Sequence, residues 1–235
     1  MEAARRYQAS LAKPPESLGR LEELSIQLAG ITGKVHNRMD TPHLLVFAAD
    51  NGVAEEGVSS APQSVTLMQT INLTRAKTGA STLCKHFGVG ITVCDVGVKA
   101  DIHEPAVLNR KIAYGTRNMA KEPAMTREQA TRAILTGIGL AMRTEASALG
   151  VGEMGIGNTT TSAAVASVLL HQSPEILTGR GAGLSNDGLQ RKIRAIDRAI
   201  QVNQPNPEDP IDVLRKIGGL DLAALCGVCL GGARY

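Results

Sequence analysis

The fold is decided by one stretch of sequence, His43-Leu-Leu-Val-Phe-Ala-Ala49, which ends in Asp50-Asn-Gly52. A short and continuous apolar run of this kind is typical of a strand covered on both faces, as in parallel sheets. A second run, Gly90-Ile-Thr-Val-Cys94, has the same character and ends in Asp95-Val-Gly97. Two such strands with helical patterns around them predict an α/β fold with a parallel sheet.

Helical patterns lie before, between and after these strands. A capping box, Thr126-Arg-Glu-Gln129, opens the clearest helix, which is predicted to close near Gly150. Residues 98–125 show little period and predict a long loop. The alternation predicts a Rossmann-like open parallel sheet flanked by helices. The other predicted helices are Ser17–Gly30 with Gly30 as C-cap, Pro62–Leu73 with Ser60 as N-cap, Thr82–Phe87, Ser162–Leu170 and Asn186–Val202.

Composition excludes several classes of function. The chain has 235 residues, 43% of them hydrophobic and 20% charged, which is ordinary for a globular protein. Its formal net charge of +3 is too small to indicate a nucleic-acid or membrane surface. The N-terminus is charged and leads into no apolar segment, and no apolar run has the length of a membrane span. We therefore expect a soluble, cytoplasmic protein.

The second informative stretch is Gly150-Val-Gly-Glu-Met-Gly-Ile-Gly-Asn-Thr-Thr160. Its glycines remove side chains from a predicted turn, and an apolar helical run follows the polar residues that begin at Asn158. Such a loop brings backbone N–H groups and a helix N-terminus to one point, which suits a phosphate or another anion. Glu153 is the one carboxylate inside the loop, and we expect it to be buried and to face a developing positive charge.

The same glycines match the spacing of the dinucleotide-binding fingerprint. The match is weak, because residues 143–149 have the pattern of a helix end rather than that of the buried strand which the fingerprint requires. Glu175 has the spacing of the ribose-binding acidic residue, but no apolar strand leads into it. NAD binding is therefore a minor alternative.

A second glycine turn, Gly179-Arg-Gly-Ala-Gly183, comes shortly before Lys192. A cation near a glycine turn is a reasonable partner for an anion. The predicted helix around Lys192 also carries a row of arginines, which is more often solvated than a binding surface. The arginines of this row are Arg191, Arg194 and Arg198.

Two predicted strands end in an aspartate. Ligands of open parallel sheets bind at the carboxyl ends of the strands, which points to Asp50 and, less strongly, to Asp95 as site residues. The alternative is that each aspartate caps a turn or a helix N-terminus, which is at least as common.

Cysteine and histidine patterns favour no metal site. Cys226-Gly-Val-Cys229 has the spacing of a metal-ligand pair, but no second pair accompanies it. The motif lies in the apolar run of residues 222–230, so we interpret it as a pair of buried, inert thiols. The histidines are scattered, without a pair at ligand spacing.

Many short motifs, in one order, resemble those of the nicotinate-nucleotide:dimethylbenzimidazole phosphoribosyltransferases of cobalamin biosynthesis. The resemblance covers nearly the whole chain. Its motifs are Lys13-Pro-Pro-Glu-Ser-Leu-Gly-Arg-Leu21, Ala49-Asp-Asn-Gly-Val53, Glu56-Gly-Val58, Asn72-Leu-Thr-Arg75, Asp95-Val-Gly97, Gly150-Val-Gly-Glu-Met-Gly155, Asn158-Thr-Thr160, Asn203-Gln-Pro-Asn-Pro207, Ile211-Asp-Val-Leu214 and Gly218-Gly219.

The resemblance implies transfer of phosphoribose from nicotinate mononucleotide to 5,6-dimethylbenzimidazole or a related base. The products are α-ribazole 5′-phosphate and nicotinate, with inversion at the anomeric carbon. Pyridinium nicotinate is already a cationic leaving group, so neither a metal nor a cofactor is expected. The resemblance also implies a homodimer whose partners are small molecules, with no nucleic acid and no membrane.

Individual site residues follow from the same resemblance. Glu153 and Lys192 match catalytic positions of the family, and Gln69 matches a position that lines the benzimidazole pocket. Ala61 falls where well-known members have a serine, which puts the choice of base in question. The remaining residues expected to bind the substrate are Asp50, Met154, Gly155, Asn158, Gly181 and Gly183.

The resemblance further implies two domains, residues 1–40 as an N-terminal helical segment of a smaller subdomain and residues 41–235 as the α/β substrate-binding domain, incomplete at its C-terminal end. Family members continue past the position of Tyr235, and the glutamate taken as their general base lies there. Two hypotheses follow, an active phosphoribosyltransferase and a catalytically impaired or partner-dependent fragment that still binds the nucleotide.

Overall fold

The computed structural model describes residues 1–233 and contains two compact units, Met1–Asp40 and Thr41–Tyr235. The first unit consists of helices α1 (Glu2–Ser10) and α2 (Arg20–Thr32). A hydrogen bond from Gln8 Nε2 to Ser25 Oγ, of 2.7 Å, joins the two helices. The predicted C-cap at Gly30 is wrong, because α2 continues to Thr32 and its C-cap is Gly33, where a φ of 70° favours glycine.

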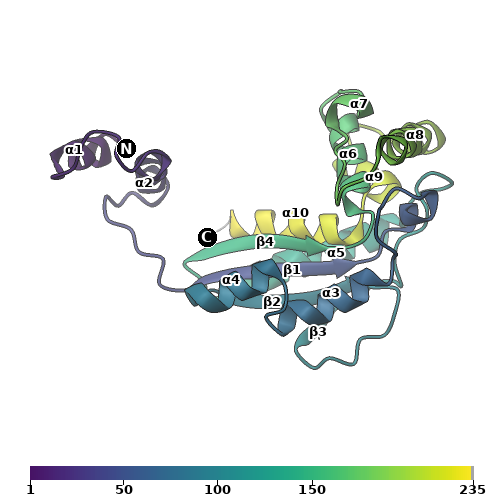
Figure 1. Cartoon of the computed structure of the whole chain (residues 1–235), viewed down its shortest axis with the longest axis horizontal. Coiled ribbons are helices and arrows are strands. Elements are labelled where there is room, and N and C mark those ends of the chain that lie inside the picture. Colours follow the sequence, from purple (N-terminus) through teal and green to yellow (C-terminus); the bar gives the residue numbers. More distant parts are fainter. Residues whose placement is uncertain (234–235) are drawn as a thin grey trace. The chain divides into compact units, whose positions relative to one another are not determined.

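The second unit is built on a parallel sheet with the strand order β3-β2-β1-β4 (Figure 1). Helices α3 and α4 cover one face, and α5 and α10 cover the other. The strands are β1 (Pro42–Ala49), β2 (Gly90–Gly97), β3 (Val107–Asn109) and β4 (Ala148–Met154). The helices are η1 (Gly52–Glu56), α3 (Val65–Thr74), α4 (Gly79–Phe87), α5 (Arg127–Arg143), α6 (Asn158–Leu169), α7 (Pro174–Leu177), α8 (Asn186–Asn203), α9 (Pro210–Ile217) and α10 (Leu220–Gly232).

The apolar run of β1 is buried on both faces, as the sequence predicts. Leu45 and Phe47 belong to the core cluster that includes α10, whereas Val46 packs with Val93 and Leu73 on the opposite face. Alternate side chains of a strand point to opposite faces, so a strand between two helical layers needs apolar residues at every position. The predicted α/β class, a parallel sheet flanked by helices, is confirmed.

Helices α5 and α10 approach each other closely because glycines lie at their contact. A Cβ atom on Gly137 would lie 2.0 Å from Ala224 O, and one on Gly227 would lie 2.0 Å from Ile134 O. Any side chain at either position would therefore collide with backbone. This contact holds α10 against the sheet, and α10 carries a residue of the site described below.

Several predicted boundaries are wrong. Residues 148–154 form strand β4, which pairs with β1 in parallel, instead of a helix end and a glycine loop. The glycines of β4 hide the apolar pattern of a strand, and its pairing with β1 overrides their low strand propensity. Strand β3 interrupts the predicted loop of residues 98–125. Helix α3 begins at Val65 rather than Pro62, and α4 begins at Gly79, behind a Thr78–Ser81 capping box.

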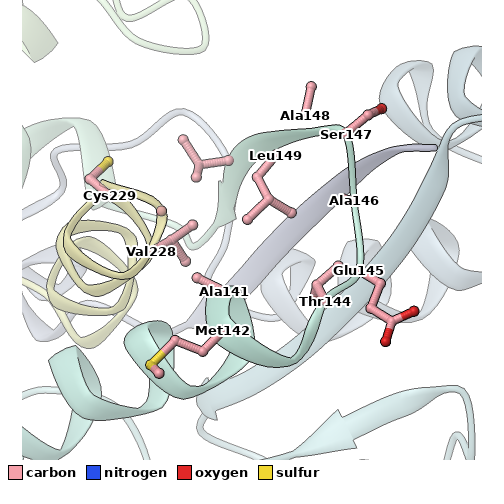
Figure 2. Close-up of a pocket in the computed structure, with 12 residues that line it drawn as sticks. Ala141, Met142, Thr144, Glu145, Ala146, Ser147, Ala148, Leu149, Val228 and Cys229 are labelled. Carbon is pink, nitrogen blue, oxygen red and sulfur yellow. The ribbon is translucent and has the colours of Figure 1, made fainter. Parts of the chain in front are cut away.

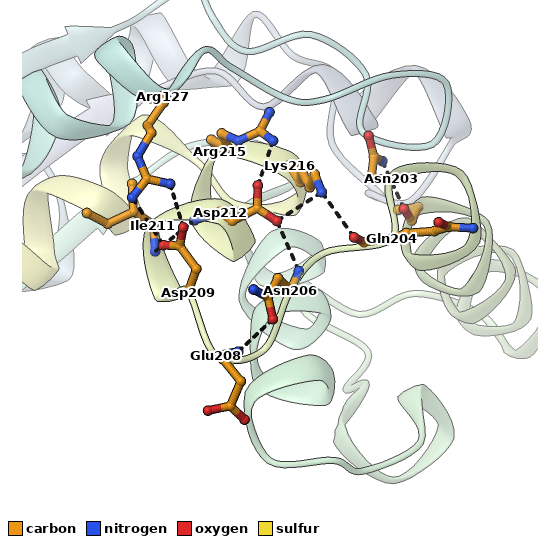
Figure 3. A network of polar contacts seen from close by, with 11 residues as sticks. Arg127, Asn203, Gln204, Asn206, Glu208, Asp209, Ile211, Asp212, Arg215 and Lys216 are labelled. Carbon is orange, nitrogen blue, oxygen red and sulfur yellow. Dashed lines mark hydrogen bonds and ion pairs between the residues drawn. The ribbon is translucent and has the colours of Figure 1, made fainter.

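The turn between α8 and α9 is held by one buried carboxylate, Asp212 (Figure 3). Asp212 Oδ2 accepts a 3.0 Å hydrogen bond from Asn206 N and lies 2.9 Å from Lys216 Nζ, while Oδ1 lies 2.6 Å from Arg215 Nη2. Burial alone would raise the pKa of Asp212, but these partners outweigh burial and lower the pKa from 3.8 to about 2. The network ties the loop after α8 to helix α9.

We expect the substitution Asp212→Asn to destabilise the protein by about 2 kcal/mol at neutral pH, from a pKa depressed by nearly two units. A carboxyl group whose pKa is lower in the folded than in the unfolded protein stabilises the fold fully at pH values above the unfolded pKa. This stabilisation is lost as the pH falls through the folded pKa. The difference between wild type and variant should therefore be full at pH 5 and vanish between pH 4 and pH 2. Urea unfolding measures it, with exposed Asp40→Asn as the control. A difference that does not change with pH would contradict the prediction.

Candidate active site

The turn that follows β4 is shaped by close backbone contacts. A Cβ atom on Gly155 would lie 2.1 Å from Ala49 O, so this position admits only glycine. Ile156 N donates a 3.0 Å hydrogen bond to Thr66 Oγ1 of α3, and Gly157 has a φ of 94° where α6 begins. Asn158 N and Thr160 N donate to Gly155 O and Gly157 O at 3.2 and 2.9 Å, so among the described residues Thr159 N is the first-turn N–H of α6 that has no protein acceptor.

A pocket of about 260 Å³ lies at this turn. Its walls come from the end of β4, the start of α6, the segment after η1 and the second glycine turn. Ser60 Oγ donates a 3.0 Å hydrogen bond to Ala182 O and joins the last two of these segments. The predicted site residues that the structure brings together in this pocket are Glu153, Met154, Gly155, Asn158 and Gly181.

Glu153 is the second-last residue of β4, and it is paired with Phe47 of β1 in the sheet. Its Oε2 accepts a hydrogen bond from Asn158 Nδ2. Partial loss of water around the carboxyl group raises the pKa of Glu153. The expectation of a buried side chain is wrong, because Glu153 lies on an edge strand of the described sheet and stays accessible to solvent from the pocket.

Lys192 lies behind the pocket and is fully buried. Its Nζ donates to Thr159 Oγ1 at 2.7 Å and to Gly179 O at 3.2 Å, and a Cβ atom on Gly181 would lie 3.5 Å from it. In the described residues, Lys192 forms no ion pair with a carboxylate. Burial lowers its pKa. A buried ammonium between two glycine turns is suited to an anion that enters the pocket.

Besides Lys192, four predicted site residues do not line this pocket. Gln69 is half-buried on α3, one turn after Thr66, and Ala61 stands two positions after the wall residue Ser59. Gly183 follows the wall residue Ala182 and is exposed. Asp50 is buried at the end of β1, where its Oδ2 accepts a 2.8 Å hydrogen bond from Lys99 N. Asp50 therefore holds the loop that follows β2, at the carboxyl ends of the strands.

Asp95 has the capping role that the sequence left open. Its Oδ1 accepts from Gly97 N and Val98 N at 3.0 and 2.8 Å, and its Oδ2 lies 2.8 Å from Lys111 Nζ. The carboxylate is thus fully partnered by its own loop, and its function there is structural.

The two cysteines of the Cys226–Cys229 motif differ in their exposure to solvent. Cys226 is half-buried, but Cys229 is exposed on α10, so the expectation of two buried thiols is wrong for Cys229. The helix turns the second cysteine away from α5, a rotation that the apolar composition of the run does not reveal. No group of three or more His, Cys, Asp or Glu side chains suited to a metal ion occurs in residues 1–233.

Two buried polar residues beneath the turn were not recognised from the sequence. Asp221, at the start of α10, and Asn51, after β1, are 1% and 0% exposed and share a 3.3 Å hydrogen bond. Asn51 stands in the quoted Asp-Asn-Gly segment, but Asp221 adjoins the apolar run of α10. The one available signal is a charged residue next to such a run, which calls for a partner.

A larger cavity, of about 710 Å³, lies between the end of α5, the start of β4 and α10 (Figure 2). Its walls are mostly apolar, with Leu149 and Val228 pointing into it, and Glu145 is the one charged residue that lines it in the described chain. It adjoins the amino end of β4, whereas ligands of parallel sheets bind at the carboxyl ends. The smaller pocket at Glu153 is therefore the candidate active site.

The fold and the pocket define an α/β protein with a candidate active site at the carboxyl edge of a parallel sheet. Within the described chain, no helix is both long enough and apolar enough to cross a bilayer. Residues 1–235 match the family described as Phosphoribosyltransferase. The chain belongs to this phosphoribosyltransferase family, which confirms the resemblance found in the sequence motifs.

Relatives of known name agree with this assignment. The nicotinate-nucleotide–dimethylbenzimidazole phosphoribosyltransferase of Clostridium tetani (strain Massachusetts / E88) is 48% identical over 228 residues, which are 96% of this chain and 63% of that protein. The protein of the same name from Alkaliphilus metalliredigens (strain QYMF) is 51% identical over 237 residues, covering 99% of this chain and 68% of that protein.

Solved structures show the same fold. The crystal structure of CobT from Thermus thermophilus superposes with a TM-score of 0.92 at 39% sequence identity. The match covers 99% of this chain and 71% of that chain. This chain thus spans between 63% and 71% of the length of these relatives.

Proposed function

We propose that the protein transfers phosphoribose from nicotinate mononucleotide to 5,6-dimethylbenzimidazole or a related base, in the assembly of the lower ligand of cobalamin. The bond from the anomeric carbon to the nicotinate nitrogen breaks, and a bond to a benzimidazole nitrogen forms. The benzimidazole N–H proton is released, so the products are α-ribazole 5′-phosphate and nicotinate. The names of the relatives support this substrate pair.

The observation that carries the proposal is Lys192, a buried ammonium without a carboxylate partner in the described chain, between two glycine turns. A phosphate in the pocket supplies the missing negative charge and accepts a hydrogen bond from Thr159 N at the start of α6, which lines the pocket. Gly155 and Gly181 allow the phosphate oxygens to reach the backbone, because neither carries a side chain. These features favour the 5′-phosphate of a nucleotide.

Glu153 is suited to the reacting end of the nucleotide. As the bond to the pyridinium nitrogen breaks, its electron pair leaves with nicotinate and the anomeric centre gains the character of an oxocarbenium ion. A carboxylate stabilises that charge more in the transition state than in the ground state. Asn158 holds the carboxylate by a hydrogen bond and so fixes its direction. Gln69 lies on α3 and Ala61 in the segment before it, and we propose that this side of the pocket receives the incoming base.

The proposal is tested by incubating the chain with nicotinate mononucleotide and dimethylbenzimidazole and separating the products by liquid chromatography. Formation of nicotinate and α-ribazole 5′-phosphate in equal amounts supports it. Binding of the nucleotide without product over a range of protein concentrations would contradict a transferase activity. Tight binding of NAD without binding of the mononucleotide would contradict the proposed site. We further propose that the protein is a cytoplasmic homodimer, which sedimentation tests for the oligomeric state.

A further inference from the structure

The phosphate turn rests on a buried pair of polar side chains, Asn51 and Asp221. Asn51 Nδ2 donates to Asp221 Oδ2 at 3.3 Å, and both atoms lie directly under Gly155. A Cβ atom on Gly155 would lie 3.0 Å from each of them. Gly157 packs on the same asparagine, because a Cβ atom there would lie 3.4 Å from Asn51 Cβ. The position of the turn therefore depends on this pair.

Only one of the two possible hydrogen bonds between Asn51 and Asp221 forms if Asp221 is ionised, because a carboxylate has no proton to donate to Asn51 Oδ1. Asn51 Oδ1 is buried and accepts no hydrogen bond from any described residue. Asp221 Oδ1 lies on the same side, since a Cβ atom on Gly219 would lie 2.2 Å from Asp221 Oδ1 and 2.5 Å from Asn51 Oδ1. A carboxylate and a carbonyl oxygen repel each other in a buried site. A proton on Asp221 Oδ1 turns this repulsion into a second hydrogen bond.

We propose that Asp221 is a positioning residue, whose neutral carboxyl group forms a two-way acid–amide pair with Asn51 beneath Gly155 and holds the turn in the form that binds the nucleotide phosphate. The role as a support for phosphate binding rests on the proposed function. Asp221 touches the turn and not the reacting atoms. It acts through Asn51 and Gly155.

The surroundings of Asp221 favour the neutral form. Burial, and after it the charge of Glu153 on β4, raise the pKa of Asp221 from 3.8 to about 7, although hydrogen bonds from Leu222 N and Asn51 oppose this rise. The other carboxylates at this end of the packed elements are Asp50 after β1 and Asp95 on β2, and Lys111 neutralises Asp95. Helix α5 faces α10 with apolar residues.

Ionisation of Asp221 has two effects on the phosphate turn. It removes the donor to Asn51 Oδ1, and it places a negative charge under a site that binds an anion. Both effects weaken phosphate binding above about pH 7, independently of the titration of the ligand. Asp221→Asn keeps a two-way pair with Asn51 and never ionises, although its NH2 group at the Oδ1 position no longer accepts the 2.9 Å hydrogen bond from Leu222 N, whereas Asp221→Ala removes the pair at every pH.

The test compares the affinity for nicotinate mononucleotide of the wild type, Asp221→Asn and Asp221→Ala between pH 6 and pH 8.5. We expect the affinity of Asp221→Asn relative to the wild type to rise by about tenfold between pH 6 and pH 8.5. The alanine variant should bind weakly throughout. Taking ratios at each pH cancels the titration of the phosphate. The exposed control Glu128→Gln should follow the wild type. A constant ratio between wild type and asparagine variant would overturn the proposal.

A second readout separates this inference from the proposed function. The carbon-13 shift of the Asp221 carboxyl group, followed by nuclear magnetic resonance in the full chain without ligand, should titrate near pH 7. The side-chain amide signals of Asn51 should shift with it, and Glu153→Gln should lower the midpoint. A carboxyl group that titrates near pH 4 would overturn the pairing. If no variant binds the nucleotide, the proposed function fails, and this titration still decides the state of Asp221.

Discussion

Replacing Glu153 by glutamine is expected to lower the turnover of nicotinate mononucleotide by a factor of about 10² to 10³, with a much smaller effect on the affinity for the nucleotide. The substitution keeps the size of the side chain but removes the charge that faces the anomeric carbon. Asn158 still has an oxygen to which it donates, so the turn should keep its shape. The measurement is the rate of nicotinate release at saturating nucleotide and benzimidazole.

The pH dependence of the same reaction gives a second check on Glu153. Its pKa is raised by loss of water, and the ionised form is the one that stabilises the transition state. Turnover should therefore rise with pH through this raised pKa, and the glutamine variant should lose that limb of the profile. Glu145→Gln, at the other end of β4 in the cavity of Figure 2, is the matched control and should retain the wild-type profile. Equal turnover of wild type and Glu153→Gln would place the chemistry elsewhere.

Replacing Lys192 by methionine is expected to weaken the binding of nicotinate mononucleotide by about 100-fold. The physical reason is that a phosphate in the pocket would lose a buried cationic partner, the ammonium group of Lys192. Free protein should respond differently, because methionine fills a similar volume and removes a buried charge that has no carboxylate partner in the described chain. The thermal midpoint without ligand should therefore stay the same or rise.

The two halves of this prediction are measured separately, by isothermal titration with the nucleotide and by thermal unfolding without it. Arg191→Gln is the matched control, because Arg191 precedes Lys192 but lies on the exposed arginine row of α8. We expect this control to bind the nucleotide like the wild type. Equal loss of affinity in both variants would assign phosphate binding to the exposed row. A lower midpoint for Lys192→Met would indicate that the lysine stabilises the fold itself.

Local signals in the sequence were sufficient for much of the fold. The unbroken apolar run of β1 predicts a strand between two helical layers, because every position of such a strand meets a hydrophobic neighbour. The Thr126–Gln129 capping box predicts the start of α5, and the structure shows both of its hydrogen bonds. Strand β4 was missed, since its glycines carry no apolar pattern and only the pairing with β1 makes it a strand.

For the site, the sequence by itself determined the chemical parts, and the tertiary structure decided which of them meet. The glycine turn and Glu153 are adjacent in the chain, so their chemistry is visible in a local pattern. Lys192 and Thr159 are 33 positions apart, and Asn51 and Asp221 are 170 apart, so only folding brings these pairs together. Burial, which lowers the pKa of Lys192 and raises that of Asp221, is a property of the packed layers and has no local signal in the chain.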